Sequence, residues 1–249
     1  MIHYAVGLIS FVAIFGGALL GIFAARALPE HHLSSETRAA VTVSVAVVGT
    51  LSALVLGLMI STASSSFSAR AHDVVTISVD LIRMKHLLLR YGPEADDARA
   101  KLRTYAVAKM QQLFPETGEP SQTDEATVEM LEAMQDAILS LAPTDERHRW
   151  LRSDALTLSD SLWQARWLLA EKAGSSIPLP FLVLLILWLA IVFFSFGLFA
   201  PLNGTAITIL CSMAVSGGIT MILELDSPLS GLVRISAEPM RQALAQIVH

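Results

Sequence analysis

Cysteine is almost absent from this 249-residue sequence, which limits the chemistry open to the protein. The single cysteine, Cys211, excludes a disulfide within one chain, and no cysteine or histidine spacing typical of a metal site is present. A lone thiol within an apolar run is typical of an inert, buried cysteine. We therefore expect neither a disulfide framework nor a metal centre.

Catalytic motifs are missing as well. The sequence has no P-loop, no nucleophile elbow, no zinc-protease helix and no glycine-rich dinucleotide turn. His31 and His32 are adjacent and point apart on a helix, whereas a closed metal site needs three or four converging ligands. We expect no enzymatic activity, no cofactor and no bound metal.

Charge is scarce and unevenly placed. Only 16% of the residues are charged and the formal net charge is −5, so we expect no basic surface for nucleic acid. Most charges lie between the second and third of four apolar runs that contain no Asp, Glu or Lys. These runs are Tyr4–Leu28, Ala39–Ile60, Leu179–Ala200 and Ala206–Leu223.

The four runs predict four transmembrane helices, because about 20 apolar residues cross the roughly 30 Å hydrocarbon core of a bilayer. The first run is longer than the core of a signal peptide, and Met1–His3 before it has no Lys or Arg, so we expect it to be retained. The predicted fold class is an all-α integral membrane protein with a helical cytoplasmic insert between the second and third spans.

Positive charges near the spans mark the cytoplasmic side of a membrane protein. They follow the second and fourth runs here, which predicts that the insert and both termini are cytoplasmic. The expected organisation has transmembrane helices 1 and 2 in residues 4–62 and a helical cytoplasmic domain in 63–178. Transmembrane helices 3 and 4 occupy 179–223, and a cytoplasmic turn with a short amphipathic helix occupies 224–249.

Helix breakers and caps divide the non-membrane part of the chain. No proline occurs between Ala39 and Arg90, which allows the second span to continue into water as one helix. No alternating strand pattern is visible. Further helices are predicted for Glu94–Leu113, Asp124–Leu141, residues 145–172 and Glu238–Ile247.

Two spans carry patterns that point to helix contacts. Gly17 and Gly21 belong to a stripe of small residues spaced four apart, which is typical of close helix packing either within a chain or between subunits. In the second span, Ser61, Ser65 and Ser68 continue the helical face of Leu54 and Leu58. The serine-rich stretch 61–68 suits either a helix lining water or a flexible break, because serine is a weak helix former.

The end of the fourth span carries an unusual polar motif. Glu224 and Asp226 lie at the predicted membrane edge, Pro228 and Gly231 favour a turn, and Arg234 follows. Ionisable groups at this depth are costly unless they are paired or hydrated. The motif therefore predicts either a turn held by a salt bridge or an acidic ring at a cytoplasmic vestibule.

The sequence resembles a bacterial family of bestrophin-like membrane proteins of unestablished function. Three blocks carry the resemblance, together with the order of two spans, a helical insert and two spans. They are residues 54–62 running into 67–70, residues 180–203, and residues 223–236. The dense acidic calcium clasp of animal bestrophins has no counterpart beyond Glu224 and Asp226.

Bestrophins are pentameric ion channels, so the resemblance implies a homopentamer in a bacterial inner (plasma) membrane. Its partners would be the inorganic ions that pass through it. It also implies that the second span lines the pore. The neck, which is the narrow apolar constriction of the pore, would be formed by Leu51, Leu54, Val55 and Leu58. The polar lining beyond it would be formed by Ser61, Ser65 and Ser68.

A second function remains open at this stage, namely a non-conducting scaffold or sensor that binds a partner through its cytoplasmic helices. The two functions differ in what Leu54, Leu58, Ser61 and Ser65 face. An axial cavity favours the channel, and another helix packed against them favours the scaffold.

Overall fold

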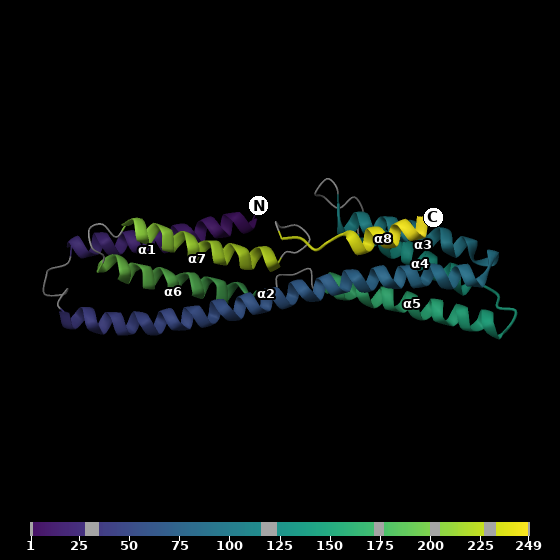
Figure 1. Ribbon diagram of the computed structural model, residues 1–249, viewed down its shortest axis with the longest axis horizontal. Coiled ribbons are helices and arrows are strands. Elements are labelled where there is room, and N and C mark those ends of the chain that lie inside the picture. The colour runs from purple at the N-terminus through teal and green to yellow at the C-terminus, as the bar shows by residue number, and fades with distance from the viewer. Residues whose placement is uncertain are drawn as a thin grey trace. The chain divides into compact units, whose positions relative to one another are not determined.

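A computed structural model of the protein describes residues 2–27, 35–115, 124–171, 177–199, 205–226 and 233–248. Within these ranges nearly every residue is helical and no β-strand occurs, as Figure 1 shows. The predicted all-α class is therefore confirmed. The elements are α1 (Ile2–Ala27), α2 (Ser35–Tyr91), the 3-10 turn η2 (Pro93–Ala95), α3 (Asp96–Leu113), α4 (Asp124–Leu139), α5 (Glu146–Glu171), α6 (Leu179–Leu198), α7 (Thr205–Asp226) and α8 (Glu238–Val248).

Four of these helices are long and apolar enough to cross a membrane, which confirms the four predicted spans. The qualifying segments lie in α1, α2, α6 and α7. Helix α2 is continuous over 57 residues and includes the serine-rich stretch 61–68, so this stretch is helical and not a flexible break. A helix of this length is possible because no proline interrupts it.

The described chain folds as two compact units. The first consists of Met1–Phe67 with Ser175–Ser227, and the second of Ser68–Gly174 with Pro228–His249. Helix α2 contributes its N-terminal part to the first unit and its C-terminal part to the second.

In the first unit, α1 packs against both α6 and α7. Its buried apolar core includes Ile14, Leu185 and Ile219, one from each of these helices, and α2 adds Met59 and Ala63. The core of this unit is therefore built chiefly by α1, α6 and α7, with α2 joining through one face.

The contact between α1 and α6 depends on glycine. A Cβ atom on Gly17 would lie 2.6 Å from the carbonyl oxygen of Ala190, and one on Gly21 would overlap the carbonyl oxygen of Phe194. Gly197 of α6 faces α1 in the same way, against the carbonyl oxygen of Ala18. The small-residue stripe of α1 thus faces a helix of the same chain.

One sequence-based expectation about the first unit is wrong. Cys211 was expected to be buried, but its side chain is exposed on the surface of the single chain. The reason is the phase of α7, which directs Ser212, Ser216 and Ile219 into the interior at steps of four and three residues.

Substitution of Gly21 by valine should disrupt the packing of α1 on α6, because the added atoms occupy space already filled by the backbone of α6. Overpacking of this kind costs about 1–3 kcal/mol, so we expect the melting temperature of the purified protein in detergent to fall by about 5 °C. A Cβ atom on Gly16 would meet no other atom within 4 Å, so Gly16→Val on the same helix is the matched control and should not change the melting temperature. Equal shifts in the two variants would contradict the close contact at Gly21.

In the second unit, one apolar core joins residues of α2, α3, α4, α5 and α8. The predicted amphipathic tail helix is present as α8, and it buries Met240, Ala243 and Ile247 in this core.

The start of α5 is fixed by Asp145, whose carboxylate accepts hydrogen bonds from the backbone N–H and the Nδ1 atom of His148 at 2.8 and 2.7 Å. These hydrogen bonds lower the pKa of Asp145.

A polar network connects α3, α4 and α5 beside this core. Lys109 Nζ donates to Gln112 Oε1 at 2.9 Å, and Gln112 Nε2 donates to Asp124 Oδ1 at 3.1 Å. Arg166 Nη2 donates to the other carboxylate oxygen of Asp124 at 2.6 Å. Burial lowers the pKa of Lys109 to about 8 in spite of the nearby carboxylate of Asp124.

The Lys109 ammonium should make the stability of the protein depend on pH. Between its folded pKa of about 8 and its ordinary pKa of 10.5, the unfolded chain binds a proton that the folded chain has lost. The free energy of unfolding should therefore rise with pH in this window, by at most about 1.4 kcal/mol per pH unit.

Substitution of Lys109 by methionine should remove this rise. Denaturant unfolding followed by tryptophan fluorescence measures it, since Trp150, Trp163 and Trp167 all lie in the second unit. The control is Lys101→Met, which removes a more exposed lysine of α3 that is paired with Asp97. Parallel pH profiles for wild type and Lys109→Met would show that the buried ammonium does not titrate in this range.

Candidate functional site

Helix α2 carries a continuous exposed stripe, which we call the α2 seam. Its members are separated by alternating steps of three and four residues, and every one of them is exposed in the single chain. They are Leu51, Leu54, Leu58, Ser61, Ser65, Ser68, His72, Val75 and Val79. A mean spacing of 3.5 residues is the repeat that keeps one helix face turned towards partner helices in a left-handed supercoil.

The seam changes chemistry along its length. Leu54 and Leu58 are 70% and 67% exposed, and Leu51 is 44% exposed, so this part of the seam is an apolar surface. The serines that follow at positions 61, 65 and 68 replace this apolar surface by hydroxyl groups. His72 is the only titratable side chain of the seam.

The opposite face of α2 is buried within the same chain. Met59 and Ala63 belong to the core of the first unit, and Val74, Ile77 and Leu81 are buried further along the helix. Helix α2 thus has one face that is satisfied by its own chain and one that is not. In lipid the leucines of the second face need no protein partner, whereas in water they are exposed apolar surface.

Seven predicted site residues fall on or beside this face. Leu51, Leu54, Leu58 and the three serines are all members of the seam. Val55 differs, because it is half-buried and packs against the core of the first unit. It follows Leu54 by one residue and is therefore rotated by about 100° around the helix axis, at the border of the seam.

Two apolar grooves flank α2 in the first unit. One has a volume of about 220 Å³ and lies between α2 and the start of α6, where Leu58, Met59 and Phe181 line it. The other has a volume of about 530 Å³ and separates the N-terminal part of α2 from α6 and α7. At this second groove, the guanidinium carbon of Arg38 lies 5.7 Å from the ring centroid of Phe199.

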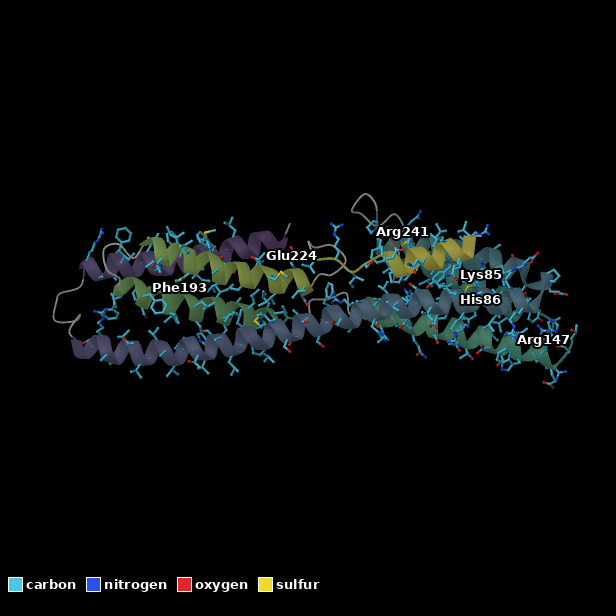
Figure 2. All side chains as sticks on the ribbon, in the orientation of Figure 1. Lys85, His86, Arg147, Phe193, Glu224 and Arg241 are labelled. Atoms are coloured by element: carbon cyan, nitrogen blue, oxygen red, sulfur yellow. The ribbon has the colours of Figure 1, made fainter. Side chains whose placement is uncertain are left out.

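The polar motif after the fourth span is only partly within the described residues. Glu224 and Asp226 lie on the last turn of α7 and are 3% and 4% exposed, whereas Arg234 is exposed. Figure 2 labels Glu224 at this end of α7. Pro228 and Gly231 lie outside the described residues. The two acidic side chains are thus buried within one chain, unlike the residues of the seam.

Sequence reasoning missed part of the seam. Its continuation through His72, Val75 and Val79 follows the same spacing and could have been found by extending the repeat beyond Ser68. The groove beside Arg38 could not have been found in this way, because it is formed by segments of α2, α6 and α7 that are far apart in the sequence.

Two solved structures of a bacterial protein share this fold. The chain is similar to the crystal structure of a bestrophin homolog from Klebsiella pneumoniae with an isoleucine-to-threonine mutation. The TM-score is 0.66 at 14% sequence identity, and the match covers 98% of this chain and 99% of that one. A leucine-to-threonine variant of the homolog gives a TM-score of 0.64 at 16% identity, with 96% and 97% covered.

The family is shown by the sequence itself. None of the curated protein sequences matches the chain. The bestrophin-like domain, however, matches residues 12–240, which include parts of all four apolar helices and the helical insert between them. The predicted resemblance is therefore confirmed, and the chain belongs to the bestrophin-like family of membrane proteins.

Proposed function

We propose that the protein is a homopentameric ion channel in which the α2 seams of five copies surround a central pore. The observation that carries this proposal is the exposed apolar face of α2. Leu54 and Leu58 are more than two-thirds exposed in a single chain, while the opposite face of the same helix is buried. The number five rests on the resemblance to bestrophins.

A ring of α2 helices accounts for the chemistry of the seam. Leu51, Leu54 and Leu58 form stacked apolar rings, with Val55 at their border, and these rings constitute the neck. A hydrophobic constriction closes a pore by excluding water, and it opens when it is widened or made polar. The hydroxyl rings of Ser61, Ser65 and Ser68 then hold water on one side of the neck.

None of the nine seam residues is Asp, Glu, Lys or Arg. A neck of this composition limits the passage of ions by hydration and not by charge, so we propose that it acts as a gate more than as a charge filter. The orientation that we propose places both termini and residues 63–178 in the cytoplasm of a bacterium, with the four apolar helices in its inner membrane.

Substitution of Leu58 by serine tests the neck. If Leu58 contributes about 1.4 kcal/mol to the barrier for ions, the substitution should raise the macroscopic current about tenfold. The measurement is the current of purified protein in planar bilayers, at matched protein-to-lipid ratio and in symmetrical KCl.

The matched control is Leu20→Ser in α1, because Leu20 is 64% exposed but does not lie on α2. We expect its current to equal that of the wild type. An equal rise in both variants would contradict a neck at Leu58. If neither the wild type nor any variant passes current, the proposal of an ion channel is wrong and the non-conducting scaffold is favoured.

A further inference from the structure

A cleft with a basic lining lies in the second unit, between α2, α3 and α8. Its volume is about 390 Å³, which is within the range of small-molecule sites. Lys85, which Figure 2 labels, lies on its α2 side. The residues lining the cleft are Lys85 and Leu89 of α2, Asp96, Arg99, Ala100, Leu102 and Arg103 of α3, and Ile247 of α8.

Positive charge exceeds negative charge in this cleft. Three cations line it, and Asp96 is the one carboxylate among the lining residues. Asp96 forms an ion pair with Arg99 on the same turn of α3. Among the residues that the structure describes, no carboxylate forms an ion pair with Lys85 or Arg103.

Lys85 and Arg103 use only part of their hydrogen-bonding capacity on α8. Lys85 Nζ donates to the carbonyl oxygen of Gln246, and Arg103 Nη2 donates to that of Val248 at 2.8 Å. These contacts satisfy carbonyl groups of the last turn of α8, where the helix dipole is negative. An ammonium has three donors and a guanidinium five, so both side chains retain donors for a ligand.

Two further features suit an anion. Asp96, Arg99 and Ala100 belong to the first turns of α3, the end of the helix at which the dipole is positive. Leu89, Leu102 and Ile247 give the cleft an apolar wall that reduces the screening of its charges by water. Guanidinium groups, which supply two of the three cations, bind phosphate oxygens in a bidentate manner.

We propose that this cleft binds a phosphate-bearing anion, which bridges Lys85 of α2 to Arg99 and Arg103 of α3 and thereby secures α8. The site is independent of ion conduction along the α2 seam. The bound anion adds negative charge beside Lys85 and Arg103, reduces the repulsion among the cations of the cleft and strengthens the attachment of the last turn of α8. Its effect is therefore greater protection of the backbone amides of α8.

Inorganic pyrophosphate is the probe for this site, and the full-length protein in nanodiscs of phosphatidylcholine is the sample. Titration calorimetry measures binding at constant ionic strength, and hydrogen exchange measures the protection of α8. We expect saturable binding together with slower exchange in residues 238–248. Chloride at the same ionic strength should produce neither effect.

Arg99→Gln separates ligand binding from the docking of α8. Arg99 lines the cleft and its guanidinium donates to Asp96 of its own helix, whereas Lys85 and Arg103 hold α8. This variant should therefore weaken pyrophosphate binding at least tenfold and leave α8 exchange in the absence of anion unchanged. The control is Arg149→Gln, because Arg149 is paired with Glu146 at the same three-residue spacing on α5. This control should bind pyrophosphate as the wild type does.

A second arm identifies the source of the phosphate. Nanodiscs that contain phosphatidic acid, without pyrophosphate, test a lipid headgroup as the ligand. Protection of α8 in these discs that is lost in Arg99→Gln supports a lipid phosphate, whereas an effect of pyrophosphate alone supports a soluble anion. If neither phosphate source protects α8, or if Arg99→Gln responds as the wild type does, the proposal is wrong.

Discussion

The two unequal faces of α2 are the constraint on which the rest of the structure depends. In the first unit, one face of α2 buries Met59 and Ala63 in the core, which fixes the rotation of this part of the helix about its own axis. Once that rotation is fixed, Leu54, Leu58 and the serines of the seam have to face outward. Apolar side chains in lipid gain little from burial against another helix, so the exposure of these leucines is compatible with a face that lines a cavity.

The first unit shows how that rotation is maintained. Gly17 and Gly21 allow α1 to approach α6 so closely that backbone atoms of the two helices are in contact. Because α1 also contacts α7, these three helices form a support against which α2 rests through Met59 and Ala63. The support leaves α2 flanked by grooves, so that it is less enclosed than its neighbours.

Much of the fold could be predicted because it depends on local signals. The apolar runs indicated four spans, the absence of proline allowed a long α2, and the caps near Asp124 and Asp145 placed α4 and α5 within a few residues. Leu54 and Leu58 are exposed in the single chain, and their predicted place in a pore neck stays a prediction. Burial of single residues was harder to predict, because the phase of α7 decides that Cys211 is exposed and Ser212 is buried.

Sites made of distant segments escaped sequence analysis. The basic cleft joins Lys85, Arg103 and the end of α8, and each of these charges resembles an ordinary solvated surface residue in the sequence. The buried Lys109 is another example, since its low exposure follows from the packing of α3 beside α4 and α5 and not from its neighbours in the chain.

The most direct test of a pore along the α2 seam is a cryo-EM map of the protein in nanodiscs, read for symmetry and for what the seam faces. We expect a closed fivefold ring in which Leu54, Leu58 and Ser61 face a continuous axial cavity. A monomer, or a ring whose centre is filled by packed side chains or lipid, would contradict the pore.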